Sequence, residues 1–126
     1  MSSGRVLVID DDRDLCGELL DALEEEGYSA SAAWDIARAK DLIAENGYDV
    51  ILLDYKMPGD GGIGILRILK EKKIQAKVLL ISGRPFVEDL LREAGLLDAV
   101  SAIIPKPIAF ETLLEAIAGA QLPPGQ

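Results

Sequence analysis

The sequence predicts an α/β fold built on a doubly wound, five-stranded parallel sheet. Short, mostly apolar segments recur along the chain, and each is followed by a segment with apolar residues at helical spacing. A strand that is apolar at every position is buried on both faces, which is typical of parallel sheets covered by helices on both sides. The length of 126 residues fits one such domain.

Each element rests on a local pattern. The strands are runs of β-branched and aliphatic residues, of which Tyr28–Ala33 is the weakest. Asp35 is a typical N-cap, Pro85 suits the first turn of a helix, and glycines at 27, 47 and 95 are typical helix ends. The segment Pro58–Gly62 predicts a turn. In chain order, the expected elements are strand Val6–Ile9, helix Leu15–Gly27, strand Tyr28–Ala33, helix Asp35–Asn46, strand Val50–Leu53, helix Ile63–Lys72, strand Val78–Ile81, helix Pro85–Ala94, strand Ala102–Ile104 and a last helix from Phe110.

Charge and rare residue types exclude several classes of function. The net charge of −9 argues against direct binding of nucleic acids and against an anionic membrane surface. The single cysteine, Cys16, excludes an internal disulfide and a multi-cysteine metal site, and we expect it to pack as a small hydrophobic residue. Without histidine, the chain has no Ser–His or Cys–His catalysis. No apolar run reaches membrane-spanning length, so we expect a soluble protein of a reducing compartment.

The residues that carry chemistry stand where the predicted strands end. Asp10 and Asp11 follow the first strand, Asp54 follows the third, Ser82 the fourth, and Lys106 comes shortly after the fifth. Ligands of open parallel sheets bind beyond the carboxyl ends of the strands. We therefore expect three carboxylates, one hydroxyl and one ammonium group to meet in one small cleft.

Three carboxylates packed together repel one another. Either one of them takes a proton at a raised pKa, or a cation neutralises the group. A set of oxygen ligands without histidine favours a hard cation, and Mg²⁺ suits a shallow site that also binds a phosphate. The cluster therefore predicts a magnesium site for phosphoryl chemistry, in which an aspartate can itself be the nucleophile. Lys106 and Ser82 would bind the oxygens of the transferred group.

Four motifs carry a resemblance to a known family. They are Val-Leu-Val-Ile-Asp-Asp-Asp, Val-Ile-Leu-Leu-Asp-Tyr-Lys-Met-Pro-Gly, Val-Leu-Leu-Ile-Ser-Gly and Ile-Ile-Pro-Lys-Pro, in this order. Together they resemble the receiver domain of two-component response regulators, over about residues 4–120. The resemblance implies a flavodoxin-like (βα)5 fold with strand order 2-1-3-4-5. Residues 121–126 are then interpreted as a C-terminal tail or the start of a linker.

The resemblance also implies a role for each site residue. Asp54 is similar to the phosphoryl acceptor. A sensor histidine kinase or a phosphotransfer protein would supply the phosphoryl group. Asp11 would bind Mg²⁺ directly and Asp10 mostly through water, together with Asp54 and the backbone carbonyl of Lys56. Ser82 matches the switch hydroxyl that turns toward the phosphoryl group. Lys106 matches the family's lysine, and Pro107 after it suggests a cis peptide bond.

As a receiver, the chain would be a regulator and no enzyme in the ordinary sense. It would promote its own phosphorylation and its slow dephosphorylation in the cytoplasm, without binding nucleic acid or membrane directly. Its output would pass through the surface formed by the helix from Pro85, the strand Ala102–Ile104 and the helix from Phe110. That surface would contact a downstream effector domain or protein, and family resemblance also allows a homodimer through the two helices.

One position departs from the family pattern, and two others occupy places that commonly affect the lifetime of the phosphoryl group. Ile103 stands where an aromatic switch residue is common, so that an aromatic rotamer is replaced by an aliphatic side chain that can still repack. Lys56 and Arg84 occupy positions that commonly tune the lifetime of the phosphoryl group, and both are basic. The stretch before Lys106 is also long, and its apolar residues Leu96, Leu97 and Val100 would extend the preceding helix or line a partner surface.

The same residues allow other interpretations. Acidic residues 10–12 are also favoured at a helix N-terminus, and we expect Asp12 to be only a cap or a solvated charge. The segment also fits a haloacid-dehalogenase phosphatase, with Asp10 as nucleophile and Asp12 as acid, but no aspartate follows Lys106 to hold its metal. A pseudo-receiver that works without phosphate is disfavoured by the intact acidic set. A flavodoxin-like flavin protein is disfavoured because no hydroxyl- and glycine-rich loop follows the first strand.

Overall fold

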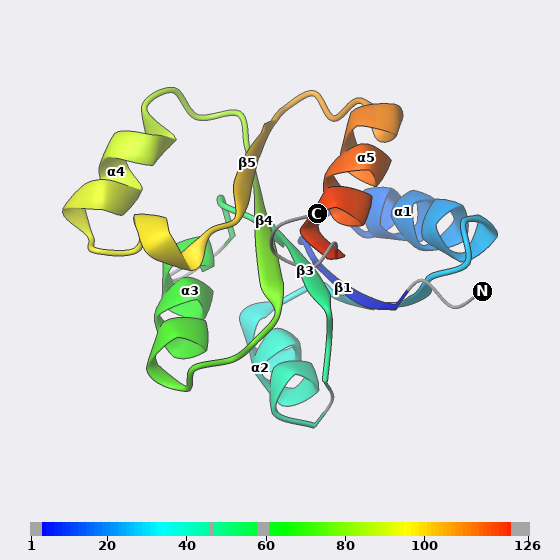
Figure 1. The fold of residues 1–126 in the computed structure, drawn as a ribbon, viewed down its shortest axis with the longest axis horizontal. Coiled ribbons are helices and arrows are strands. Elements are labelled where there is room, and N and C mark those ends of the chain that lie inside the picture. The colour runs from blue at the N-terminus through cyan, green and yellow to red at the C-terminus, as the bar shows by residue number, and fades with distance from the viewer. Residues whose placement is uncertain (1–3, 46, 58–60, 122–126) are drawn as a thin grey trace.

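The computed structural model describes residues 4–45, 47–57 and 61–121, in which strands and helices alternate (Figure 1). The elements are β1 (Arg5–Ile9), α1 (Arg13–Glu25), β2 (Ser29–Ala33), α2 (Ile36–Glu45), β3 (Val50–Asp54), α3 (Gly61–Glu71), β4 (Lys77–Ser82), α4 (Val87–Glu93), the short 3-10 helix η1 (Leu97–Ala99), β5 (Ala102–Pro105) and α5 (Phe110–Gln121). No helix in these described segments is long and apolar enough to cross a membrane.

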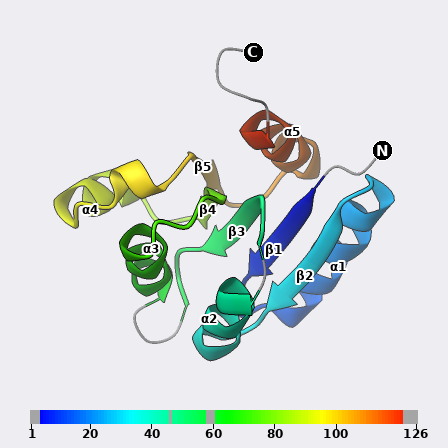
Figure 2. The same cartoon turned by 60° about the horizontal axis from the view of Figure 1, so that its bottom comes forward.

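The five strands form one parallel sheet in the order β2-β1-β3-β4-β5, which confirms the predicted fold class and strand order (Figure 2). The chain winds outward from β1 to β2 and then returns to the other side of β1 to form β3. The crevice at such a reversal, at the carboxyl ends of the strands, is where open α/β sheets bind ligands. The register pairs Ile9 with Leu53 and Leu80 with Ile103, and so fixes which residues meet at that edge.

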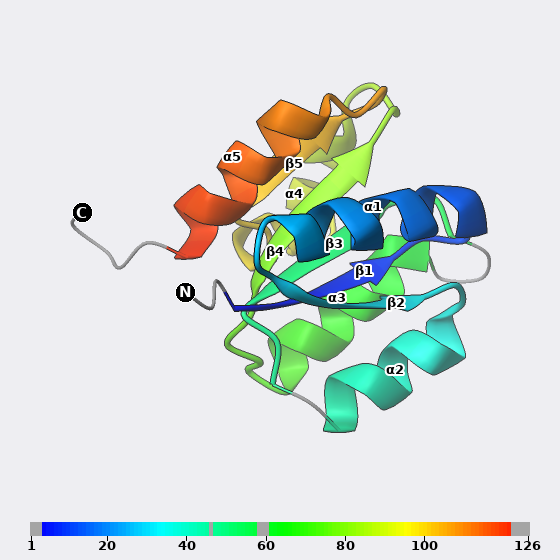
Figure 3. The same ribbon diagram turned by 90° about the vertical axis from the view of Figure 1, so that its right-hand side faces the viewer.

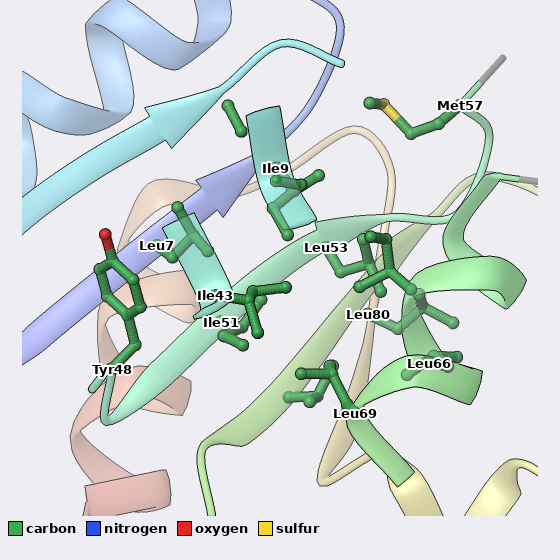
Figure 4. Close-up of a cluster of buried hydrophobic side chains, with 14 of the residues drawn as sticks. Leu7, Ile9, Ile43, Tyr48, Ile51, Leu53, Met57, Leu66, Leu69 and Leu80 are labelled. Carbon is green, nitrogen blue, oxygen red and sulfur yellow. The ribbon is translucent and has the colours of Figure 1, made fainter. Parts of the chain in front are cut away.

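Helices cover both faces of the sheet (Figure 3). Alternate strand residues such as Leu7 and Leu53 point to the face packed by α2, α3 and α4, which Figure 4 shows in close-up. Their neighbours, such as Val8 and Leu52, point to the face packed by α1 and α5. Fully burying one such aliphatic side chain contributes about 1.5–3 kcal/mol, so the two apolar layers hold the strand register.

Helix starts agree with capping chemistry where the cap is local. The side chain of Asp12 accepts a hydrogen bond from the backbone N–H of Leu15 at 3.1 Å, and Asp35 accepts one from Arg38 at 2.7 Å. Both caps were expected from the sequence, and each satisfies a backbone donor that the first helical turn leaves free. Cys16 is buried in α1, as expected for a small hydrophobic residue.

Other boundaries differ from the predictions. Helix α4 begins at Val87, after Phe86 in the left-handed region with φ of 60°, so Pro85 precedes the helix instead of occupying its first turn. Gly95, with φ of 72°, follows its end, and the next residues form η1 in place of an extension of α4. Leu96 is buried in the core and does not line a partner surface.

Some predictions fall partly outside the described residues. Helix α3 begins at Gly61, two residues earlier than expected, so the last two residues of the predicted turn are helical. Residues 58–60 of that turn, Asn46 at the predicted end of α2 and residues 122–126 of the tail are not described.

Candidate functional site

The structure brings the predicted site residues to one edge of the sheet. Because Ile9 pairs with Leu53, the next residues, Asp10 and Asp54, end neighbouring strands. Ser82 ends β4 and pairs with Pro105, which places Lys106 directly beyond the same edge. Asp10, Asp54 and Ser82 are the buried polar residues of the described chain, with 2%, 3% and 6% of their surface exposed. Burial of polar groups without hydrogen-bonding or charged partners is costly, so these three positions need a physical explanation.

An acidic cluster of Asp10, Asp11 and Asp54 forms the deepest part of this edge. Each offers a carboxylate oxygen, and these oxygens all lie within 4.8 Å of one another. Asp11 is exposed, whereas the other two are buried. Oδ1 of Asp10 accepts a hydrogen bond from the backbone N–H of Asp12 at 2.9 Å, but its Oδ2 is buried and has no partner among the described residues. One acceptor of the cluster is therefore left for a donor or a cation.

The electrostatics of the cluster favour a positive partner. Burial raises the pKa of Asp10 to about 6 from 3.8, and the charges of Asp54 and Asp11 add to that effect. The Asp12 amide and the Lys106 ammonium act in the opposite direction and do not cancel it. A carboxyl group that resists ionisation beside two others fits a hard cation bound by oxygen ligands. The residues present therefore fit a divalent metal, as the sequence predicted.

Lys106 places a positive charge of this chain directly beside the acidic cluster. Its Nζ lies 3.2 Å from Oδ1 of Asp54. Its backbone N–H donates to the carbonyl of Ser82 at 3.1 Å, so that the lysine is tied to the end of β4. The peptide bond to Pro107 is cis, as expected. A side chain at Gly83 would begin 3.4 Å from Cβ of Lys106, so the glycine leaves little more than contact distance there.

A cavity of about 390 Å³ opens above Asp54. Ser82 lies in its wall, and the Oγ atom accepts a hydrogen bond from the backbone N–H of Arg84 at 3.0 Å. That bond uses the oxygen of the hydroxyl as acceptor and leaves its hydrogen to donate. The lining consists of Asp54, Tyr55, Lys56, Ser82, Gly83, Arg84 and Lys106. The two predicted tuning residues, Lys56 and Arg84, are thus both at the cavity.

Ile103 lies on β5 and is half-buried. It packs against the apolar layer that includes α4 residues, next to Leu80 of β4. The position therefore connects the edge strand with the helix that follows Ser82, although it does not line the cavity.

Two positioning contacts were missed in the sequence. A Cβ on Gly62 would lie 3.0 Å from Cα of Tyr55 and 3.1 Å from the carbonyl of Asp54, so the start of α3 packs directly on the end of β3. The thiol of Cys16 donates to the backbone carbonyl of Asp10 at 3.3 Å. The sequence predicts a turn at glycines 61 and 62 and so does not reveal the packing role of Gly62. Nothing in the sequence signals the thiol contact.

Strand order and the acidic edge place the chain among the flavodoxin-like α/β proteins. A family model for the response regulator receiver domain matches residues 6–118. The chain therefore belongs to the response regulator receiver domain family, as the four motifs indicated.

Relatives and solved structures agree with this membership. The chain is 38% identical over 110 residues to the response regulator MprA of Mycobacterium sp. (strain KMS), and 32% identical over 120 residues to an uncharacterized transcriptional regulatory protein, YkoG, of Bacillus subtilis. These matches cover 87% and 95% of this chain but 47% and 52% of the relatives, so the chain spans about half their length.

Among solved structures, the receiver domain of the Francisella response regulator 1452 matches with a TM-score of 0.84 and 30% identity, over 94% of this chain and 97% of that one. The response regulator TrrA of Thermotoga maritima, solved in complex with Mg²⁺ and BeF, matches with a TM-score of 0.79 and 28% identity, over 95% and 99% of the two chains.

The raised pKa of Asp10 makes the stability of the metal-free protein depend on pH. Below about pH 4 the carboxyl is protonated in the folded and the unfolded state, and as pH rises through about 6 the folded state loses stability. At pH 8 in EDTA, we expect Asp10→Asn to raise the free energy of unfolding by about 1–3 kcal/mol. Urea denaturation at pH 4, 6 and 8 measures this free energy, with Asp41→Asn, an exposed residue of α2 outside the acidic cluster, as control. An Asp10→Asn protein no more stable than wild type at pH 8 would contradict this electrostatic account.

Proposed function

We propose that this chain is a Mg²⁺-dependent phosphorylation switch in which Asp54 accepts a phosphoryl group from a sensor histidine kinase or a phosphotransfer protein. The observation that carries the proposal is the placement of Asp54. Its side chain is buried at the base of a cavity, within the acidic cluster on one side and 3.2 Å from the ammonium of Lys106 on the other. A nucleophile, a cation site and a fixed positive charge therefore share one small space.

The metal proposal assigns Asp10, Asp11, Asp54 and the backbone carbonyl of Lys56 to Mg²⁺. Its support is the oxygen-only cluster with one buried, unpartnered carboxylate oxygen. A similar receiver structure, that of TrrA, was solved with Mg²⁺ and BeF. When bound, the ion would neutralise negative charge on the carboxylates and on the transferred group.

In the proposed reaction, a carboxylate oxygen of Asp54 attacks phosphorus in line, while the bond from phosphorus to the donor nitrogen breaks and its electron pair leaves with the donor. Lys106 stabilises the negative charge of the phosphoryl oxygens because its ammonium already lies beside Asp54. The product carries about two negative charges where Asp54 carried one. Ser82, in the wall of the same cavity, gains an acceptor for its hydroxyl hydrogen.

We infer that the signal leaves through the loop that follows Ser82. The backbone N–H of Lys106 donates to the carbonyl of Ser82, and α4 begins five residues after Ser82. A hydroxyl that turns toward the phosphoryl group would move this loop, and Ile103, packed between β4 and the α4 side, would repack with it. The output surface proposed is α4–β5–α5, with a population shift between two packings as its basis.

The phosphatase alternative loses support from the position of Asp12. Its side chain caps α1 by accepting a hydrogen bond from the backbone N–H of Leu15, which does not suit the role of an acid acting with Asp10 as nucleophile. The acids that follow Lys106 in the described chain, Glu111 and Glu115, are exposed residues of α5.

The wider setting is part of the same proposal. Residues 4–120 would form the receiver domain, with residues 121–126 as a tail or linker start, and the output surface of the domain would contact a downstream effector domain or protein in the cytoplasm. A homodimer through α4 and α5 is the family-level expectation. Support comes from the response regulator MprA and the transcriptional regulatory protein YkoG, which are each about twice as long as the matched part.

Asp54→Asn is expected to abolish phosphorylation. With acetyl phosphate and Mg²⁺, intact mass spectrometry is expected to find one phosphoryl group on the wild type, and none with EDTA or on the variant. Asp12→Asn is the matched control, since asparagine also caps helices and this side chain lies outside the proposed ligand set. An adduct of unchanged stoichiometry on Asp54→Asn, or one that forms equally in EDTA, would refute the assignment.

Lys106→Ala is expected to accept the phosphoryl group but to lose its effect on α4. The Lys106 ammonium, beside Asp54, would hold the phosphoryl oxygens. Lys106→Ala loses this side-chain contact but keeps the backbone hydrogen bond to the Ser82 carbonyl, so the variant separates phosphorylation from its effect on the end of β4. We expect amide NMR shift changes in residues 83–93 to fall by at least about half relative to phosphorylated wild type, the loss of about 1 kcal/mol of coupling. Lys40→Ala, an exposed lysine of α2, serves as control. A wild-type shift pattern in phosphorylated Lys106→Ala would contradict the role.

Lys56 and Arg84 are expected to slow hydrolysis of the aspartyl phosphate. Both side chains line the cavity and would restrict the approach of water to phosphorus. Lys56→Asn and Arg84→Ala should therefore lose the phosphoryl group about 2–10 times faster, a barrier change of about 0.4–1.4 kcal/mol. Phosphoprotein decay after removal of the donor gives the rates. Decay as slow as in wild type, or slower, would argue against this tuning.

A further inference from the structure

The chain carries one concentrated basic surface, which the phosphorylation site does not use. Residues 67–77 contain five basic residues and one acid, although the whole chain has 13 basic and 22 acidic residues. All five basic residues are exposed, and they lie at the end of α3 and the start of β4. We call this set the basic surface; its members are Arg67, Lys70, Lys72, Lys73 and Lys77.

Most of this charge is not neutralised within the molecule. Lys70 donates to Asp98 at 3.0 Å and to the carbonyl of Gly95 at 2.7 Å. For Lys72, Lys73 and Lys77, the described parts of the chain place no carboxylate within ion-pair distance. Three ammonium groups are therefore available to an acidic partner.

An exposed hydrophobic residue lies in the middle of the basic surface. Ile74 is 36% exposed and lines two cavities. One, of about 310 Å³, also includes Lys73, Lys77 and Ser101 in its lining. The other, of about 330 Å³, lies between α2 and α3 and includes Lys72. An apolar centre within a charged rim is the usual anatomy of a protein interface.

The backbone at Lys73 supports the same interpretation. Its φ of 54° is in the left-handed region that favours glycine, and the helix ends at Gly27 and Gly95 do use glycine there. The backbone N–H of Ile74 donates to the carbonyl of Leu69 at 3.0 Å, which closes the end of α3 around this residue. Glycine would adopt this backbone conformation at a lower steric cost than lysine, so the turn itself does not explain why a lysine is present.

A complementary surface exists on α1 of the same chain. Asp14, Glu18, Asp21 and Glu25 are all exposed and follow one another at spacings of four, three and four residues, so they form a stripe along one helix face. Gly17 lies within this stripe, and a Cβ there would meet nothing within 4 Å. Packing inside the monomer thus does not require glycine, and the stripe has a bare patch that can receive a side chain.

The two surfaces cannot meet within one molecule. Helix α1 packs with α5 on one face of the sheet, and α3 packs with α2 and α4 on the other (Figure 1). We propose that the basic surface of one copy binds the acidic stripe of α1 of a second copy, with Ile74 seated over Gly17. The contact is head-to-tail, because each copy uses a different surface on its neighbour.

Two physical consequences follow from this arrangement. A head-to-tail contact leaves one unused surface at each end, so association continues beyond the dimer unless the ring closes. The net charge of −9 opposes association at long range, but at physiological ionic strength charges beyond about 8 Å are largely screened. Attraction between the two surfaces then acts at contact distance and is lost in high salt.

A mixing experiment tests the pairing directly. The stripe variant Glu18→Lys/Asp21→Lys keeps the basic surface, and the basic variant Lys72→Gln/Lys73→Gln keeps the stripe. The second variant is neutral because a reversed charge there would attract the altered stripe and create a second contact in the mixture. By sedimentation velocity at about 10 μM to 1 mM, wild type should grow in average mass past a dimer, and each variant alone should stay monomeric. Their mixture should form a 1:1 complex that stops at two chains and dissociates in about 1 M NaCl.

Matched controls separate specific pairing from net charge and folding. Arg38→Glu makes the same charge change as Lys73→Glu but on α2, outside the basic surface, so only Lys73→Glu should weaken association, by about tenfold or more. Circular dichroism checks that each variant folds. A mixture that stays monomeric, a wild type that is monomeric throughout, or a dimer unaffected by both double variants would overturn the proposal. Because no phosphodonor is present, these results do not depend on the role of Asp54.

Discussion

The structure depends on one constraint, the side-by-side burial of two carboxylates at the carboxyl edge of the sheet. Asp10 and Asp54 are adjacent because β1 and β3 are parallel neighbours with Ile9 opposite Leu53. Apolar packing on both faces keeps the two carboxylates adjacent although they repel each other. A shift of one residue would move every core side chain of a strand to the opposite face. The hydrophobic core thus fixes a charge arrangement that would not form by itself.

The rest of the site can be understood as partial compensation for that burial. One backbone amide and one lysine face three carboxylates, so the chain neutralises the cluster incompletely. Incomplete neutralisation gives a site an affinity for cations and makes it sensitive to added charge. Lys106 matters twice, because its ammonium contacts Asp54 while its backbone contacts Ser82. This one residue therefore contacts both Asp54 and the end of β4.

Sequence patterns predicted the parts of the molecule that local chemistry determines. Apolar runs gave the five strands, strand order followed from the family resemblance, and the caps Asp12 and Asp35 are confirmed by their hydrogen bonds. The misses depend on tertiary contacts: Leu96 is buried against the core, and Gly62 is required by the backbone of Tyr55. Such contacts join residues far apart in the chain, and no local pattern reports them. The site residues meet as predicted, whereas their chemical roles stay predictions.

The chain uses its charges in two physically different ways. At the carboxyl edge, charges are buried, so each interacts strongly with its neighbours and must be compensated within a few ångströms. On α1 and at the end of α3, charges are exposed, and water and salt reduce their effect to contact range. Buried charges suit a site that responds to one ion or one phosphoryl group. Exposed charges in a stripe and a patch contribute little to folding, so their segregation on opposite faces is better explained by contacts between molecules.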